Sequence, residues 1–434
     1  MDKMADVLGR AGAWCGQNKY LSAIKNAFQN FMPLTIAGAI GVLWCNVLVN
    51  DQTGLGLFFK PIMALDFLNP AFQAVNFCTI SCITVGITLG IAQEIGVWNM
   101  GAERAGYIPG LVGLAAWLSV TNTSHMVEGA KEAFTGIAGN ELGATGLFTG
   151  MIIGVLSVEL FCFFEKQDAL KIKMPEQVPP GVARAFEVLV PATITLIITA
   201  CIGSACYNLT GLYLNDVIKN GIQGPLGAVG ATIPGVMIIY LVIMLFWLVG
   251  IHGNNMLSAV KEALFTPLAL ENVEKFNKGE KPTNIINMYA LQMWGEFGGS
   301  GVTIGLVIAI MIFGKREDNK AIAGLSLVPG LFNINETVTF GIPMVLNPIL
   351  GIPFVFACLV TILVGYVLTV IGFCPVACLT VPWTTPPIVF GFLATGANVM
   401  GAVTQAILIV VSTVIYVPFL IAYEKYQNKQ AAEA

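Results

Sequence analysis

Two side chains, Glu336 and His252, are the candidates for chemistry in a chain that is otherwise strongly apolar. Between Lys320 and Glu424, Glu336 is the single Asp, Glu, Lys, Arg or His. A lone acid at membrane depth costs roughly 2.5–3.5 kcal/mol on insertion scales, so such residues normally face a partner, a cavity or a substrate. We therefore predict a polar site at Glu336. The alternative is a structural acid that accepts hydrogen bonds from amides of its own loop.

His252 is the corresponding group in the middle of the chain. It follows a long apolar run and is the single Asp, Glu, Lys, Arg or His between Lys219 and Lys261. Gly250 and Gly253 flank it and leave room for a ligand or an unwound backbone. We predict that His252 lies in a translocation path. The alternative is an imidazole that bonds a backbone carbonyl at a helix end.

Tryptophans near these polar segments indicate the chemistry of the ligand. Trp247, Trp294 and Trp383 all lie close to them in the sequence. The apolar face of a sugar ring stacks on an indole, while its hydroxyls need partners such as Glu, Asn and His. Each tryptophan could instead be an anchor at the membrane interface. Because the apolar segments hold no cluster of acids for Na⁺ or a proton relay, the set is more typical of a carbohydrate site than of an ion site.

The segment that must position Glu336, residues 333–348, is a poor candidate for a continuous helix. Its helix breakers and those just before it are Pro329, Gly330, Asn333, Asn335, Gly341 and Pro343. Pro and Gly interrupt helices, and irregular backbone at membrane depth is tolerated only where protein or water covers it. Segments 321–342 and 374–398 are both interrupted in this way, which is the usual indication of a binding site in a transporter.

The composition places the chain in a membrane. Of 434 residues, 56% are hydrophobic and 11% are charged, whereas soluble proteins average about 25% charged. Candidate spans lie near 28–50, 72–93, 105–122, 142–164, 186–214, 228–250 and 399–423. Because roughly 20 apolar residues cross a bilayer, we predict an all-α polytopic membrane protein with about ten transmembrane helices plus two re-entrant segments.

Several functional classes are excluded by what the sequence lacks. The ten cysteines show no CxxC pair and no Cys/His spacing suited to a metal, so they are interpreted as small hydrophobic residues. The chain has no Walker loop, HExxH or GxSxG motif, which argues against ATP hydrolysis and zinc proteolysis. No basic face suggests nucleic acid. We predict no cofactor and no metal.

The loops show a strong asymmetry of positive charge. If the N-terminus is cytoplasmic, the cytoplasmic side receives Arg104, Lys166, Lys171, Lys173, Arg184, Lys261, Lys275, Lys278 and Lys281, and the outer side receives Lys60, Lys131 and Lys219. Cytoplasmic loops of membrane proteins carry such an excess, so we predict that both termini are cytoplasmic. A proline-rich connector at 167–187 divides the chain into transmembrane halves at 1–187 and 188–434.

Six sequence blocks resemble one known family. They are AIKNAFQNFMPLTIAGA (23–39), LVPATI (189–194), FWLVGIHG (246–253), GGSGVTIGL (298–306), FNINETVTFGIPMVLNPILGIPF (332–354) and VPWTTP (381–386). They are similar to the enzyme IIC components of the sugar phosphotransferase system, in the lactose, cellobiose and N,N′-diacetylchitobiose branch. The resemblance covers nearly the whole chain.

The resemblance implies a homodimeric permease of the bacterial inner membrane that binds a disaccharide from outside. It implies that the 6-hydroxyl of the sugar is presented to a separate cytosolic IIB protein, which receives its phosphoryl group from IIA and carries it on a cysteine. The chain itself would then be a phosphotransferase subunit without a phosphorylated residue. The N-terminal half is expected to serve dimerisation or as a scaffold, and the C-terminal half to hold the sugar.

Site residues are carried over by motif. The expected substrate-binding residues are Glu336, His252, Trp383, Trp247, Asn254 and Asn335, the last two by adjacency alone. Glu336 and His252 are also the expected catalytic pair, because a carboxylate and an imidazole can orient one hydroxyl and assist its deprotonation. Thr337 and Thr385 replace residues common in the family, a proline and a methionine, so the sequence leaves the choice of disaccharide open. Glu296 receives no role from the resemblance.

Two functions other than group translocation are alternatives for this sequence. The first is a proton-coupled disaccharide symporter in which Glu336 and His252 form the protonation site. The second is a membrane sensor or anchor without flux, which the re-entrant segments disfavour because a scaffold seldom needs polar breaks at membrane depth.

Overall fold

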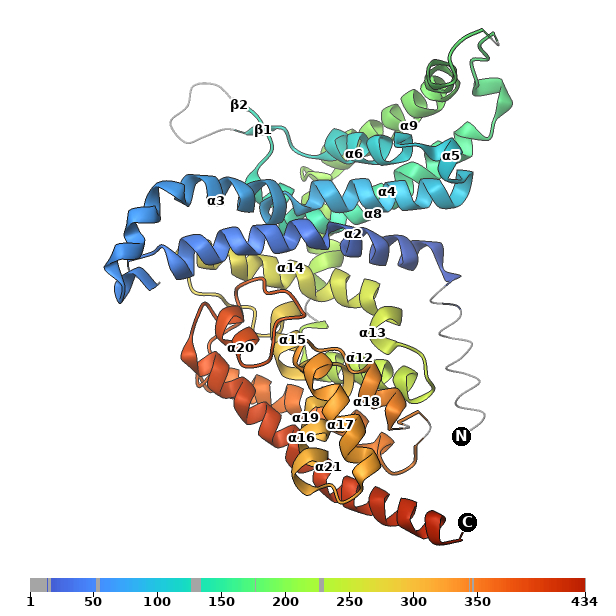
Figure 1. The fold of residues 1–434 in the computed structure, drawn as a ribbon. Coiled ribbons are helices and arrows are strands. Elements are labelled where there is room, and N and C mark those ends of the chain that lie inside the picture. The colour runs from blue at the N-terminus through green and yellow to red at the C-terminus, as the bar shows by residue number, and fades with distance from the viewer. Residues whose placement is uncertain are drawn as a thin grey trace. The chain divides into compact units, whose positions relative to one another are not determined.

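The computed structural model of this chain is mostly helical and describes residues 14, 17–51, 55–125, 134–175, 177–225, 230–342, 344–345 and 347–433. Pro343 and Lys131, which were used in the sequence analysis, lie outside the described residues. The chain divides into two compact units, whose elements are labelled in Figure 1. Unit 1 holds described residues 39–74 and 230–433, and unit 2 holds 17–38 and 75–225.

Unit 2 is built from apolar helices. Its elements are α2 (Lys19–Leu43, to residue 38), the π-helix η4 (Phe77–Ser81), α4 (Ile83–Met100), α5 (Ala102–Ala105), α6 (Ile108–Val120), α7 (Gly139–Leu142), α8 (Ala144–Glu165), η5 (Asp168–Leu170), α9 (Pro180–Thr210), α10 (Leu214–Ile218) and η6 (Lys219–Gln223). Strands β1 (Ser124–His125) and β2 (Phe134–Thr135) pair antiparallel, with Ser124 opposite Thr135. This short hairpin is a departure from the all-α prediction.

Small residues allow the helices of unit 2 to pack closely. A Cβ atom at Gly113 of α6 would lie 2.3 Å from the Cβ of Ala92 on α4, and one at Gly150 of α8 would lie 2.2 Å from Thr88 Oγ1. Helices α4, α6 and α8 therefore contact one another almost backbone to backbone (Figure 1). This is the usual way in which membrane helices associate, because lipid provides no hydrophobic drive between them.

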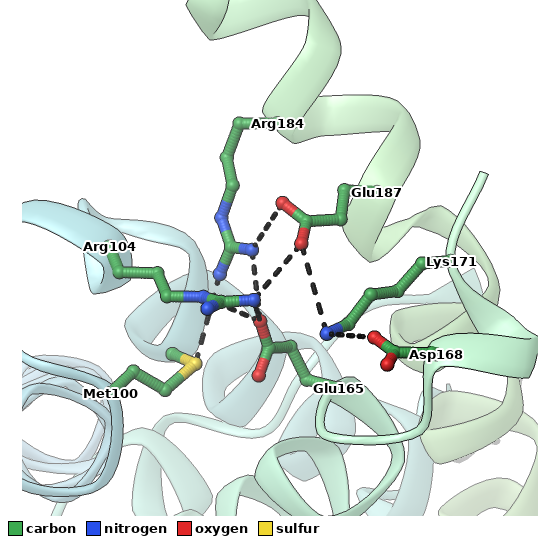
Figure 2. Close-up of polar contacts among 7 residues, drawn as sticks. All are labelled: Met100, Arg104, Glu165, Asp168, Lys171, Arg184 and Glu187. Carbon is green, nitrogen blue, oxygen red and sulfur yellow. Dashed lines mark hydrogen bonds and ion pairs between the residues drawn. The ribbon is translucent and has the colours of Figure 1, made fainter. Parts of the chain in front are cut away.

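A charged cluster connects α5, α8 and α9 within unit 2 (Figure 2). The Glu165 carboxylate, 3% exposed, accepts from Arg104 Nε and from Arg184 Nη1, each at 3.0 Å. Glu187 accepts from the same two arginines at 3.0 and 2.9 Å. The loop predicted as a basic connector thus has part of its positive charge engaged in ion pairs, including one from Lys171 to Asp168 at 3.1 Å.

Unit 1 contains the remaining elements. They are η1 (Trp44–Leu48), η2 (Leu55–Leu57), η3 (Lys60–Leu68), α3 (Asn69–Asn76, to residue 74), α12 (Ile233–Leu248), α13 (Gly253–Met256), α14 (Ser258–Asn277), α15 (Met288–Gly295), η7 (Ser300–Val302), α16 (Ile304–Phe313), α17 (Glu317–Leu331), α18 (Glu336–Gly341), α19 (Gly351–Val370), α20 (Val389–Ala394) and α21 (Val399–Glu433). Its core packs α16, α19 and α21 together with α15.

Local signals explain where the unit 1 helices start. The Thr232 hydroxyl accepts from Gly235 N at the start of α12, and the Asn287 side chain accepts from Tyr289 N and Ala290 N at the start of α15. Such N-caps satisfy amides that have no partner inside the helix. Helix α15 with η7 then meets α16 at a bend of 59°. The bend falls at Thr303, just after the glycine-rich GGSG sequence.

The membrane spans are confirmed as a class but not in number. Among the described residues, five helices are long and apolar enough to cross a membrane, or up to seven if each of two bent pairs is one span. Two shorter apolar helices, Ile108–Val120 and Ile233–Leu248, accompany them. The predicted ten crossings are not confirmed. The predicted break near Glu336 is confirmed, because α17 ends at Leu331 and α18 has only six residues.

The compact units differ from the predicted halves, 1–187 and 188–434. Helix α9 packs on α6 and α8, so residues 188–225 belong with the preceding helices, and residues 39–74 belong with the C-terminal part of the chain. The boundary in contacts therefore lies after residue 225 among the described residues. The roles assigned to the halves stay predictions.

Candidate functional site

His252 and Glu336 both stand at helix starts in unit 1. His252 is the N-cap of α13, and its Nδ1 accepts from Asn255 N at 3.3 Å. Glu336 is the first residue of α18, where free backbone N–H groups favour a negative charge. The breaks that the sequence analysis predicted are therefore what place these two side chains.

The two side chains face each other without touching. His252 Nε2 lies 3.9 Å from Glu336 Oε1, and the side chains are 38% and 46% exposed. Because Nδ1 accepts a backbone N–H, we assign the proton of the neutral ring to Nε2. The gap is too long for a direct hydrogen bond, but a hydroxyl oxygen about 2.8 Å from each atom could accept from Nε2 and donate to the carboxylate.

The charge state of the imidazole follows from its surroundings. Burial lowers the pKa of His252 below the ordinary 6.5, and the facing Glu336 carboxylate opposes this change. At neutral pH the ring is therefore neutral, as the hydrogen bond to Nδ1 requires. Within the described residues, no group of three or more His, Cys, Asp or Glu side chains is placed to hold a metal ion.

Trp247 supports the histidine from behind. Its ring centroid lies 4.4 Å from that of His252, and the indole is only 2% exposed. Its Nε1 is buried and has no hydrogen-bond partner in the described part of the chain. In this structure Trp247 thus offers little surface for a sugar. Trp383, in contrast, is 44% exposed and keeps a free aromatic surface.

Asn254 and Asn335 support the site through hydrogen bonds to Ser300. Asn254 Nδ2 donates to Ser300 Oγ at 2.9 Å. Asn335, which is 4% exposed, donates from Nδ2 to Ser300 O at 2.8 Å. Both amides therefore contact the glycine-rich turn at 298–303. This turn connects the segment that carries His252 to the segment that carries Glu336.

The glycine-rich turn requires unusual backbone geometry. Gly298, Gly299 and Gly301 have φ values of +68°, +87° and +77°, which glycine adopts without strain. A Cβ atom at Gly299 would lie 2.6 Å from the Cβ of Asn335. Val302 has φ +50°, an outlier for a β-branched residue, and such strain gathers at functional sites.

A third segment, which carries Trp383, is attached to the same turn. Asn333, with φ +63°, accepts from Gly298 N at 2.6 Å and donates to the carbonyls of Trp383 and Thr385. The side chain of Asn333, which lies three positions before Glu336, therefore holds the segment that carries Trp383. Sequence reasoning counted Asn333 as a helix breaker and missed this role.

Sequence reasoning also missed a buried ion pair. Lys261, assigned above to a cytoplasmic loop, lies in α14, and its side chain is 7% exposed. Its ammonium group contacts Glu296, whose Oε1 also accepts from Tyr240 Oη at 2.7 Å. The pairing joins residues 35 positions apart, and no local pattern in the sequence indicates it.

Comparisons with known proteins agree on one family. A family model described as "Phosphotransferase system, EIIC" matches residues 25–358. An oligo-beta-mannoside-specific EIIC component of Bacillus subtilis is 33% identical over 98% of this chain and 94% of the relative. A cellobiose-specific EIIC component of Lactococcus lactis is 29% identical over 98% of each chain. The crystal structure of ChbC, the IIC component of an N,N′-diacetylchitobiose-specific system, matches with a TM-score of 0.88 at 29% identity over 97% of each chain.

Proposed function

Because this chain belongs to the phosphotransferase-system EIIC family, we propose that it binds an external disaccharide and carries it across the membrane for phosphorylation. Its relatives are sugar-specific EIIC components. The names of these relatives specify oligo-β-mannosides, cellobiose and N,N′-diacetylchitobiose as their sugars. We propose a disaccharide of the cellobiose, diacetylchitobiose or lactose type as the substrate.

The observation that supports this function is the facing pair of His252 and Glu336. A hydroxyl of the sugar fits between Nε2 and Oε1, accepts from the imidazole N–H and donates to the carboxylate. When the hydroxyl oxygen attacks the phosphorus of a phosphocysteine, its proton passes to Glu336, the P–S bond breaks and the thiolate leaves. His252 holds the oxygen in line, and Trp383 supplies a face for the ring.

The partners follow from this reaction. The phosphocysteine belongs to a separate IIB protein, which receives its phosphoryl group from IIA. We further propose that the permease works as a homodimer in the bacterial inner membrane, with about ten spans, two re-entrant segments and both termini in the cytoplasm. The excess of Lys and Arg on the predicted cytoplasmic loops supports this orientation.

Substitution of the facing pair tests the proposal. Glu336→Gln keeps the size of the side chain but removes the proton acceptor, and His252→Ala removes the donor. With phosphorylated IIB supplied, both variants should lose phosphorylation of cellobiose, and the histidine change should weaken sugar binding less. Matched controls are His125→Ala and Glu317→Gln, since Glu317 is 86% exposed. Wild-type phosphorylation by Glu336→Gln would rule out the proposed role.

Transport without the phosphorelay separates this function from proton symport. In vesicles that lack IIA and IIB, group translocation predicts no accumulation of sugar phosphate and no response to a protonophore. Concentrative uptake that collapses when a protonophore is added would instead identify a symporter. The phosphotransferase relatives support the first outcome.

A further inference from the structure

The ion pair of Lys261 and Glu296 is the most deeply placed charge pair near the site. Lys261 is 7% exposed and Glu296 is 17% exposed at the side chain. Tyr240 donates to the same carboxylate oxygen that contacts the ammonium group. Removing two charges from water costs several kcal/mol per ion, so a buried pair is weak evidence for stability. Its presence here needs another reason.

Hydrogen bonds connect the pair of Lys261 and Glu296 to Asn254 and Asn335, which lie close in sequence to His252 and Glu336. Lys261 Nζ donates to Asn254 Oδ1 at 3.5 Å, and Asn254 Nδ2 donates to Ser300 Oγ at 2.9 Å. Asn335 Nδ2 donates to the carbonyl of the same serine at 2.8 Å. Asn254 lies two residues after His252, and Asn335 directly precedes Glu336. Polar contacts therefore join the ammonium group to Asn254 and Asn335, and the backbone joins these two residues to His252 and Glu336.

The ammonium group also decides which way the Asn254 amide points. A carboxamide has one oxygen that accepts and one nitrogen that donates, and it can turn over unless its partners differ. Lys261 can only donate, so it holds the oxygen, and the amide nitrogen is left for Ser300. Glu296 in turn contacts the ammonium group and holds Lys261 in place.

We propose that Lys261 and Glu296 are positioning residues, which fix Asn254 and the 298–303 turn so that His252 and Glu336 face each other across one hydroxyl. The inference rests on the proposed function, because it assumes that the facing pair binds the sugar. It assigns to Glu296 and Lys261 a role that neither the sequence nor the family resemblance supplied.

Three charged groups act on His252, and they give the proposal a signed test. Lys261 lowers the pKa of His252, whereas Glu336 and Glu296 raise it. Glu262, a half-buried carboxyl next to Lys261 on α14, has its pKa raised by burial, and the charge of Lys261 opposes this change. Loss of Lys261 should therefore raise the pKa of His252, and loss of Glu296 should lower it. These opposite displacements would show that both charges act on His252 in the active permease, and the loss of kcat in an uncharged variant then tests the positioning role.

The experiment compares Lys261→Met, Glu296→Gln and the double variant in the full-length permease, with phosphorylated IIB and cellobiose. We expect each single variant to lower kcat by about tenfold or more, because small misplacements of reacting groups are costly. The acid limb of the pH profile should move to higher pH in Lys261→Met and to lower pH in Glu296→Gln. The double variant should return it toward the wild-type position. Lys278→Met, from the exposed Lys278–Glu274 pair of the same helix, is the matched control and should change neither quantity.

Two further measurements keep the result interpretable. Asn254→Leu removes the connection without changing any charge and should lower kcat without moving the pH profile. Melting temperature and binding of cellobiose without phosphoryl donor show whether each variant folds. Wild-type kcat in both charge variants, or a loss of kcat with unmoved pH profiles and lowered melting temperatures, would overturn the inference. If Glu336→Gln also retains turnover, the proposed function fails as well; if it does not, only the positioning role fails.

Discussion

Substitution of Gly299 by alanine tests the geometry of the site most directly. Gly299 has φ +87° and ψ −176°, a region that is essentially restricted to glycine, and a side chain there costs about 1–3 kcal/mol. The added Cβ would also lie 2.6 Å from the Cβ and 2.7 Å from the Cγ of Asn335. Overpacking of this kind costs about 1–3 kcal/mol. Together the two effects amount to roughly 2–6 kcal/mol.

The contact with Asn335 determines how that strain is relieved. Asn335 is buried between the turn and Glu336, so the segment can relax only by moving the residue next to the carboxylate. We expect Gly299→Ala to lower the melting temperature and to lose most phosphorylation of cellobiose, because a displacement of about 1 Å at reacting groups costs about a hundredfold in rate.

Gly279→Ala is the matched control for this prediction. Gly279 also has a positive φ, +73°, but a Cβ atom there would meet nothing within 4 Å. It should cost about 1–2 kcal/mol of backbone energy and leave turnover unchanged. The assay is phosphorylation of radiolabelled cellobiose by membranes with phosphorylated IIB, alongside thermal melting in detergent. Equal turnover and equal melting temperatures for Gly299→Ala and wild type would refute the reasoning.

Three other predictions concern charge and backbone strain. Glu165→Gln should lower the melting temperature, by roughly 1–3 kcal/mol of stability, because it weakens the charge-assisted hydrogen bonds from Arg104 and Arg184, although Glu187 still pairs with both; Asp168→Asn, whose side chain is 81% exposed, should not. The decline of phosphorylation on the acid side should be centred below pH 6.5, because burial lowers the pKa of His252; a decline centred above 6.5 contradicts a neutral ring. Ile388→Gly should keep or raise the melting temperature, because Ile388 has φ +74° and ψ −51° and its strain, about 1–3 kcal/mol, offsets the cost of glycine. Ile352→Gly in α19, at similar exposure, should lower it.

Each member of the facing pair could be predicted as a polar site because it is chemically isolated in the sequence, and the family resemblance implied that the two act together. Glu336 and His252 each stand alone in long apolar stretches, and a lone ionisable group at membrane depth needs a partner. The break before α18 was predictable for a related reason, since Pro329, Gly330 and Asn333 cannot continue a helix without cost. Composition likewise sufficed for the helical membrane class.

The supporting residues could not be predicted, because nothing local marks them. Lys261 is followed by Glu262 in a mixed stretch that resembles a surface helix, and its partner Glu296 is distant in sequence. A tryptophan such as Trp247 has the same sequence signature whether it lies at an interface or behind a histidine. Long-range packing also decides that α9 joins the earlier helices, although the proline-rich loop before it suggested a boundary.

The partial exposure of Glu336 has a consequence for fidelity. A carboxylate and an imidazole that can activate a sugar hydroxyl can activate a water molecule in the same place, and solvent reaches both side chains. In the proposed mechanism, a phosphocysteine left beside such an open site would be hydrolysed, and its phosphoryl group would be lost without import of a sugar. The proposed mechanism therefore requires an order of events. We expect the sugar to displace the water before the phosphocysteine comes within reach.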